Sequence, residues 1–326
     1  MDRSWIKDME VGDSVKGTYA VSAIHLRTYS NGEFLSLRLA DRTGKISGVY
    51  WEGSQELFRR IPVGTIVRVD GKVGRYQGQL QLSLSSIVPL AEGEGGDKAD
   101  FLPVGPCDPE QLIQKLKQWK DSLAAEHYRK LWDCFFEDQA LFEKFSSAPA
   151  GKQWHHPYLG GLLEHTESLI QLCDRIAQQY PYLKRDLLLT GALFHDAAKA
   201  LELVYHTTFE YSDEGRLVGH IVMGAAQVRG YVEQVADFPR EEGLLLQHLI
   251  LAHQGETDES PRKPRCREAL ALHLADMIDS QLAAFTREIE KPELAGQRWT
   301  PYVNLISRYL YRGAGDEAAE GTDKEA

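Results

Sequence analysis

The spacing of apolar residues changes once along this chain, and that change constrains the fold more than any other feature. Between residues 13 and 88 apolar residues alternate with polar ones, as in the run from Leu35 to Leu39. A period of two is typical of half-buried β-strands. From residue 109 onward apolar residues recur every three or four positions, as on amphipathic helices. We therefore expect an all-β domain followed by an all-α domain.

A segment rich in Gly, Pro and charge, AEGEGGDKADFLPVGPCDP, separates the two patterns. It has no apolar periodicity and is typical of an interdomain linker. The last residues, GAGDEAAEGTDKEA, lack large apolar side chains and are acidic, which is typical of a disordered tail. The sequence thus predicts a β domain at 1–90, a linker at 91–109, a helical domain at 110–312 and a disordered acidic tail at 313–326.

Within the β domain the alternating runs predict five strands. Turn signals at Asn31-Gly32, Thr43-Gly44 and Asp70-Gly71 separate the runs, and residues 54 to 60 favour one short helix after the third strand. Five strands with a helix after the third is the order of the OB fold. This small barrel commonly presents a face to single-stranded oligonucleotides.

In the second domain the periodicity predicts an all-α helical bundle. A short stretch of strand is compatible with the residues from 205 to 211. The helices are expected at 109–121, 124–146, 159–180, 185–199, 220–236, 241–253 and 265–288.

The charge of the chain is unevenly distributed. The net charge is −11, but residues 1 to 90 hold 12 Lys and Arg against 9 Asp and Glu, or +3, which leaves −14 for the rest. The β domain is therefore the better site for a polyanion. Its candidate contacts for a single-stranded nucleic acid combine cations for phosphates with rings for base stacking. They are Arg27, Arg38, Lys45, Trp51, Arg75 and Tyr76, with a position in the core as the alternative for Trp51.

Membrane and secreted classes are not expected. No apolar run approaches the roughly 20 residues that cross a bilayer, and the first residues have no apolar core of a signal peptide. The four cysteines are scattered, without a CxxC pair, which is typical of reduced thiols. A cytoplasmic protein that does not contact the membrane is predicted.

Several histidines and aspartates lie on apolar helical faces. Apolar residues surround His165 at helical spacing, so its side chain points inward; the alternative to a functional role is a core histidine bound to a backbone carbonyl. Asp196 follows His195 at the end of a long apolar run, and its charge requires a partner. That partner is either Lys199, one turn later, or a divalent metal ion, which imidazole and carboxylate ligands suit. Asp276 is likewise an acid on an otherwise apolar helical face, and Asp279 is a nearby competitor for the same role.

The order His165, His195-Asp196, Asp276 resembles the H…HD…D signature of HD-domain phosphohydrolases. His220 and His253 lie where dinuclear HD phosphodiesterases have two further histidines. The runs HHPYLGGLLEHT at 155–166 and SDEGRLVGHI at 212–221 resemble the YhaM-type 3′→5′ exoribonucleases, whose OB-then-HD order also matches. The resemblance covers residues 1 to 312.

Two departures from the family pattern stand near the expected site. Ala197-Ala198 occupies a position where relatives usually carry Ile-Gly, and Gln254 follows His253 where a second histidine is common. Neither change removes an expected ligand. They bear on activity level and metal preference more than on the type of reaction.

The resemblance implies a metal-dependent phosphodiesterase that releases nucleoside monophosphates from single-stranded RNA, or also DNA, with metal-activated water. It implies two divalent ions, with Mn favoured and Co, Fe, Mg or Zn as alternatives. Asp196 would bridge them, and Lys199 would hold a phosphate oxygen. The resemblance assigns His165, His195 and Asp276 to one ion, His220 and His253 to the other, and it makes His155, His156 and Arg216 candidates for substrate contact.

Two rival functions stay open from the sequence. One is an HD hydrolase of cyclic or free nucleotides, against which the predicted strand-binding domain argues. The other is a non-enzymatic RNA-binding protein, against which the complete set of expected ligands argues. A homo-oligomer is compatible with either.

Overall fold

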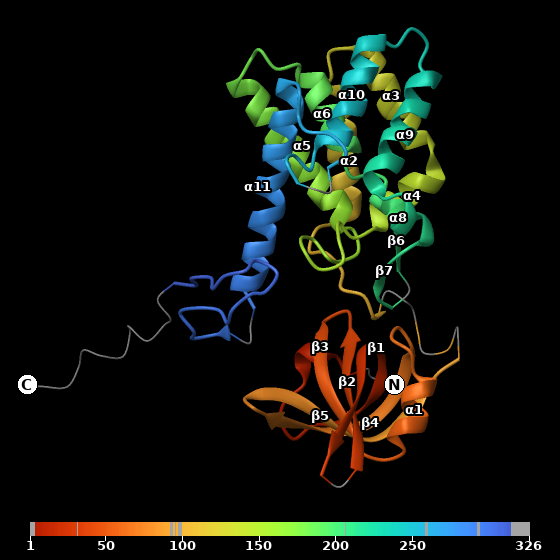
Figure 1. Ribbon diagram of the computed structural model, residues 1–326, viewed down its shortest axis with the longest axis vertical. Helices are drawn as coiled ribbons and strands as arrows, with labels where there is room; N and C mark the ends of the chain where they lie inside the picture. The colour runs from red at the N-terminus through yellow and green to blue at the C-terminus, as the bar shows by residue number, and fades with distance from the viewer. Residues whose placement is uncertain are drawn as a thin grey trace, which may run out of the picture. The chain divides into compact units, whose positions relative to one another are not determined.

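The computed structural model describes residues 4–30, 32–91, 94, 96, 100–205, 207–257, 260–291 and 294–313. By its internal contacts the chain divides into two units (Figure 1). One comprises residues up to 106 together with 203–211, and the other comprises 107–202 and the residues from 212 onward. The predicted acidic tail, apart from Gly313, lies outside the described residues.

The first unit contains a closed barrel with strands in the order β1-β2-β3-β5-β4. Strands β3 and β5 pair in parallel, and the other neighbours pair antiparallel. A short 3₁₀ helix, Ile6–Asp8, precedes the barrel. The prediction of five strands with one helix after the third is confirmed. Along the chain the elements are β1 Ser14–Tyr29, β2 Gly32–Asp41, β3 Gly44–Tyr50, α1 Ser54–Arg60, β4 Ile66–Tyr76 and β5 Gln79–Pro89.

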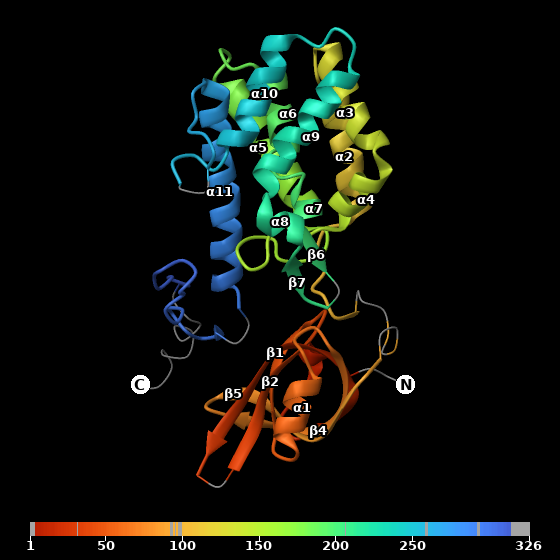
Figure 2. The same cartoon turned by 45° about the vertical axis from the view of Figure 1, so that its right-hand side comes forward.

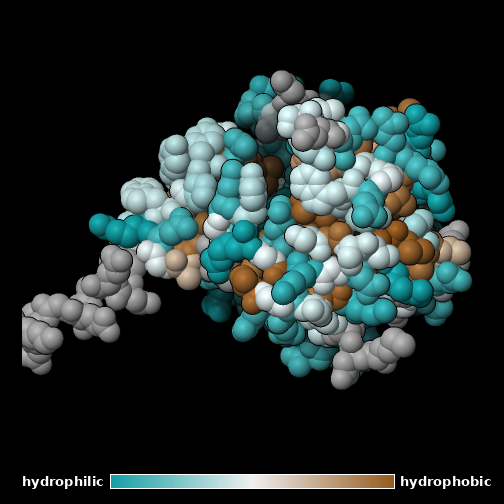
Figure 3. Space-filling model, turned by 90° about the horizontal axis from the view of Figure 1, so that it is seen from below, coloured by the Kyte–Doolittle hydropathy of each residue, from teal (hydrophilic) through white to brown (hydrophobic). Residues whose placement is uncertain are grey.

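The alternating leucines fill the interior of the barrel. Leu35, Leu37 and Leu39 on β2 are buried, and Leu82 and Leu84 on β5 join them in one apolar core. Since successive side chains of a strand point to opposite faces, the residues between them face outward. The surface drawn in Figure 3 accordingly mixes hydrophilic residues with smaller hydrophobic patches.

The predicted turn at Asp70-Gly71 is wrong. Both residues lie inside β4, where the pairing with β5 shifts register. A Cβ on Gly71 would lie 2.6 Å from the carbonyl oxygen of Ser83, so glycine here permits close approach of two strands at a bulge. The turn between β4 and β5 is instead made by Gln77 and Gly78, with φ of 49° and 82°.

The second unit is a helical bundle, as predicted, and a two-stranded hairpin leaves it after α7 (Figures 1 and 2). Its helices are α2 Pro109–Asp121, α3 Glu126–Glu137, α4 Gln139–Ser147, α5 Gly161–Gln179, α6 Arg185–Phe194, α7 Lys199–Glu202, α8 Asp213–Leu217, α9 His220–Gln234, α10 Arg240–Ala252 and α11 Arg267–Ile289; the hairpin strands are β6 Leu203–Tyr205 and β7 Phe209–Tyr211.

Two predicted helices are broken in the structure. The helix expected at 124–146 is split at Asp138, whose side chain accepts a hydrogen bond from the backbone N–H of Leu141 and so caps α4. The hydroxyl of Tyr231 donates to the same carboxylate at 2.7 Å. The helix expected at 185–199 stops at Phe194, and residues 195–198 form a turn before α7. This break frees the His195-Asp196 pair from the helix.

The four cysteines are free thiols, in agreement with the sequence prediction. Among the described helices, none has the length and apolar character that crossing a bilayer requires.

Candidate metal centre and nucleic-acid-binding face

The structure brings the six predicted ligands together from five parts of the bundle. They form two groups, and within each the ligand atoms lie within 4.8 Å of one another. The α5 residue His165 and the α11 residue Asp276 meet His195, which follows α6, in the first group. The second group joins Asp196 to the residue that begins α9 and the residue that follows α10, namely His220 and His253.

Asp196 lies between the two groups. Its Oδ2 is 3.3 Å from Nε2 of His195 and 3.9 Å from Nε2 of His165. Its Oδ1 is 3.3 Å from Nε2 of His220 and 3.5 Å from Nε2 of His253. Each carboxylate oxygen therefore faces a different set of imidazoles.

The residues present fit divalent metal ions. Among the described buried atoms, Oδ1 of Asp196 and Nε2 of His220 have no hydrogen-bond partner. A buried polar atom without a partner costs about 1–3 kcal/mol, so such atoms indicate an ion or another group that satisfies them. Nε2 of His165 and Nε2 of His195 also face each other at 3.1 Å, as two ligands of one ion can. Imidazole and carboxylate together suit divalent transition metals.

A hydrogen bond on the far side of each ring holds every histidine of the centre. The Nδ1 atoms of His195 and His253 lie 2.8 Å and 2.7 Å from the carbonyl oxygens of Ala192 and Ile250. Since a carbonyl only accepts, both Nδ1 atoms carry the proton and both Nε2 atoms present lone pairs to the centre.

Carboxylates perform the same function for the other two rings. Oδ2 of Asp279 lies 2.7 Å from Nδ1 of His165, and Oε1 of Glu202 lies 2.9 Å from Nδ1 of His220. Glu202 also accepts from the backbone N–H of His220 at 3.1 Å. From the sequence, Asp279 is only a competitor of Asp276, and Glu202 is not among the expected site residues. The three-residue spacing on one helix was a signal for Asp279, but no sequence pattern pointed to Glu202.

Burial and charge set the protonation states of the centre. Burial lowers the pKa of His165, but hydrogen bonds to Asp276 and Asp279 outweigh it and raise the pKa to about 9. Burial raises the pKa of Asp196, but Lys199 and His195 outweigh it and hold the pKa well below its usual range. The pKa of His253 is lowered by burial. The centre therefore combines an ionised Asp196 with a neutral imidazole at His253.

Lys199 contacts Asp196 directly. Its Nζ donates to Oδ2 of Asp196 at 2.7 Å and to the carbonyl of Ala150 at 2.9 Å. Burial lowers the pKa of this ammonium, but the charge of Asp196 outweighs burial and raises the pKa. The ion pair considered from the sequence is thus present beside the candidate metal ligands, and the two interpretations of Asp196 are compatible.

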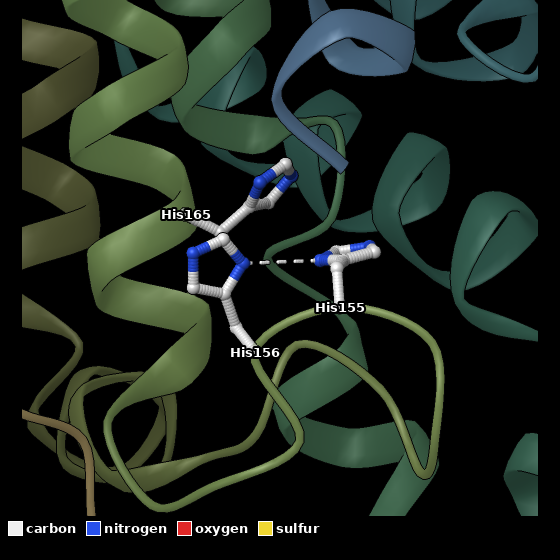
Figure 4. Close-up of side chains that lie close together, drawn as sticks. All are labelled: His155, His156 and His165. Atoms are coloured by element: carbon white, nitrogen blue, oxygen red, sulfur yellow. Dashed lines mark hydrogen bonds between the residues drawn. The ribbon is translucent and has the colours of Figure 1, made fainter. Parts of the chain in front are cut away.

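His155 and His156 lie next to the first group, on the loop before α5 (Figure 4). Their Nδ1 atoms are 3.3 Å apart, and their rings lie 4.6 Å and 5.7 Å from the ring of His165. His156 has a φ of 43°, and a Cβ on Gly161 would lie 2.1 Å from its carbonyl oxygen. A strained backbone held by a required glycine is typical of functional loops. Burial lowers the pKa of both rings, to about 4 for His156.

On the barrel, Trp51 is exposed, and the alternative of a core position is wrong. Its ring contacts Phe34 and Tyr29, with centroids 4.6 Å and 5.2 Å away. These two aromatic partners are not among the contacts expected from the sequence, although Phe34 pairs in register with Arg27, which is one of them. The remaining candidates are also exposed: Arg27, Arg38, Lys45, Arg75 and Tyr76 on the barrel and Arg216 on α8.

Comparison with known proteins matches both units. Residues 20–90 match the family model described as an OB-fold nucleic acid binding domain, and residues 162–281 match the HD domain. HD domains bind divalent metals, and the two histidine and aspartate groups lie within this match.

Curated relatives cover most of the chain. It is 32% identical to the 3′-5′ exoribonuclease YhaM of Bacillus subtilis over 305 residues, which is 93% of this chain and 96% of the relative. Identity to the YhaM protein of Shouchella clausii is 32% over 94% of this chain and 96% of the relative. The chain is 31% identical to the YhaM protein of a Geobacillus species, over 86% of this chain and 87% of the relative. The chain therefore belongs to the YhaM family of OB-fold and HD-domain 3′-5′ exoribonucleases.

Proposed function

We propose that this chain hydrolyses single-stranded RNA from the 3′ end and releases nucleoside monophosphates, with two divalent metal ions at the centre. One observation carries the proposal: the two oxygens of Asp196 face two separate ligand groups, and two atoms of that set are buried without a partner. The names of the relatives support the substrate and the direction. Mn is our first choice of metal, with Co, Fe, Mg and Zn as alternatives.

The side chains of the centre have distinct roles in this proposal. When bound, a pair of divalent ions supplies a nucleophile at neutral pH and stabilises the leaving oxygen. Asp196 joins the two groups, and the carbonyls and carboxylates behind the imidazoles keep each Nε2 directed inward. Lys199, already charged beside Asp196, balances the negative oxygens of the phosphate.

Substrate contacts are proposed on both units. In the helical unit, His155 and His156 border the first group and Arg216 is exposed, so these three are our candidates for phosphate or sugar contact. On the barrel, exposed Trp51 with Tyr29 and Phe34 provides a surface on which bases can stack. Nearby cations of the barrel would contact phosphates, so binding should weaken as salt rises. Single-stranded DNA is a second substrate that such a surface accepts.

The test uses one RNA labelled at its 5′ end and the same RNA blocked at its 3′ hydroxyl by a phosphate. Stepwise shortening of the first, with monophosphates as product and slow attack on the second, is the expected result. A single internal cut, equal attack on both, or hydrolysis confined to cyclic dinucleotides would contradict the proposal. If the protein bound RNA but did not hydrolyse it with Mn, Co, Fe, Mg or Zn, a non-enzymatic RNA-binding protein would be favoured instead.

A further inference from the structure

The outward face of α11 carries a continuous row of large apolar side chains. Each is between 40% and 62% exposed, and their spacing of three or four residues places them on one side of the helix. They span about 18 Å, at 1.5 Å of rise per residue. We call this set the α11 row; it consists of Leu270, Leu274, Met277, Ile278 and Leu282.

The other side of α11 already has its partners. The helix packs against α5, α6 and α10, and it buries Leu272, Ala275 and the candidate ligand Asp276. In Figures 1 and 2 it lies at the edge of the bundle. Single exposed apolar residues are ordinary on soluble proteins, but a contiguous row of this length marks an interaction surface.

The α11 row is free of charge. From Ala269 to Thr286 the helix has only two charged residues, Asp276 and Asp279, and both face the metal centre. The chain as a whole carries −11, so two copies repel each other overall. A neutral, apolar face is one that two identical acidic chains can bring together without like charges in contact.

We propose that the α11 row is an interface between two copies of this chain, with the two α11 helices antiparallel about a two-fold axis at Ile278. In that register Ile278 meets its own copy, and Leu274 of one chain lies opposite Leu282 of the other, because both are four residues from the axis. The same symmetry makes the contact isologous, as in most homodimers.

The ends of the helix are complementary in this arrangement. Arg267 is exposed at the first position of α11, and Glu290 is exposed just after its last. They lie eleven and twelve residues from the axis, so each Arg267 lies at nearly the same height along the helix pair as the Glu290 of the other copy, within reach of two long side chains. The dipoles of antiparallel helices also oppose each other favourably.

The size of the interface sets its strength. The dimer covers the exposed parts of ten side chains, five from each copy. This removes on the order of 800 Å² of accessible surface from water, somewhat below the roughly 1,200 Å² of small stable interfaces. Flanking residues of the helix, such as Ala271 and Gln281, supply part of the remainder. A dimer that dissociates in the micromolar range is therefore expected. The proposed dimer does not depend on the proposed exonuclease activity, so either proposal can fail while the other holds.

The experiment measures the mass of the full chain by sedimentation equilibrium over a dilution series from micromolar to nanomolar. Ile278→Glu places two carboxylates beside each other on the axis, and Leu282→Glu buries a charge opposite Leu274; each should weaken dimerisation by at least about a hundredfold. The matched control is Leu244→Glu, since this α10 leucine is 58% exposed but lies outside the α11 row. It should dimerise as the wild type does.

A charge exchange tests the register itself. Arg267→Glu and Glu290→Arg should each weaken the dimer, and the double variant should restore most of the loss. Circular dichroism melting and metal content identify any variant that fails to fold. A wild-type chain that stays monomeric throughout, or association that both Ile278→Glu and Leu282→Glu leave unchanged, would overturn the proposal. Dimerisation with no rescue by the charge exchange would overturn the antiparallel register.

Discussion

Asp196 connects the two candidate ligand groups, because each of its oxygens faces a different group. Asp196→Ala should reduce hydrolysis by at least about a hundredfold and release bound metal. Asp196→Asn keeps the side-chain volume and separates loss of charge from loss of packing. Turnover and metal content are measured together, with helix content as the control. A variant that keeps near-normal metal and activity would rule out the bridging role.

Lys199 is expected to act on the phosphate, although it also pairs with Asp196 at 2.7 Å. Lys199→Ala should lower turnover more than metal content, because an ammonium serves phosphate charge without coordinating an ion. Its matched comparison is Asp196→Ala in the same metal analysis. Equal metal loss in the two variants would show that the lysine stabilises the buried carboxylate and has no role in turnover.

Asp279 and Glu202 are expected to position the imidazoles of His165 and His220. Asp279→Asn and Glu202→Gln should each lower metal affinity by about 10- to 100-fold, since such partners orient the ring and raise its basicity. Calorimetric titration of metal into the chelated protein measures this directly. Glu210→Gln, on the β6–β7 hairpin, is the control. Unchanged affinity in both test variants would show that the carboxylates do not act through the rings.

At the scale of elements, most of the fold could be predicted because strand and helix differ in apolar period. Leu35, Leu37 and Leu39 marked an inward strand face, and the apolar spacing around His165 marked an inward helix face; both are buried as expected. The breaks could not be predicted in the same way. Asp138 interrupts a helix by capping the next one, and this depends on local hydrogen bonds that periodicity does not record.

The site was partly predictable for a related reason. The six ligands are recognisable by residue type and order, whereas Glu202 acts through a contact across 18 residues of chain. Trp51 shows the opposite limit, because a tryptophan in a strand pattern fits the core as well as the surface. In the structure it follows the last residue of β3, is exposed and contacts Tyr29 and Phe34.

The end of α11 gives a prediction for stability. Glu288 is buried and accepts from Arg287 at 3.1 Å and from Lys291. Burial raises its pKa, but Lys291 and Arg287 outweigh burial and lower it below the ordinary value of 4.5. A carboxylate whose pKa is lower in the folded protein stabilises the fold at pH values above its unfolded-state pKa. This stabilisation is lost as the pH falls through its folded-state pKa.

Glu288→Gln should therefore lower the free energy of unfolding by about 1 kcal/mol at neutral pH. The difference should shrink as the pH falls below about 4.5, where the wild-type carboxyl takes up its proton. Urea unfolding of the wild type and of Glu288→Gln, from neutral pH to a pH below about 4.5, measures this difference in unfolding free energy. Glu143→Gln on α4 is the control, since that residue is exposed. A difference that stays constant, or grows, at acid pH would contradict the ion-pair account.

In the whole molecule, the chain joins an OB-fold nucleic acid binding domain to an HD domain, as the two family matches indicate. Each unit can be understood by itself: the barrel supplies exposed rings and cations, and the bundle supplies the clustered ligands. We propose that the two ligand groups together hold two ions on which RNA hydrolysis depends.

Titration of Mn into fully chelated protein tests that claim most directly, with bound metal per chain and the rate of monophosphate release followed in the same samples. We expect no hydrolysis in the chelated protein, two ions bound at saturation, and a rate that rises steeply as the second ion binds. Full hydrolysis by the chelated protein, or saturation of the rate with no ion bound at these groups, would contradict it.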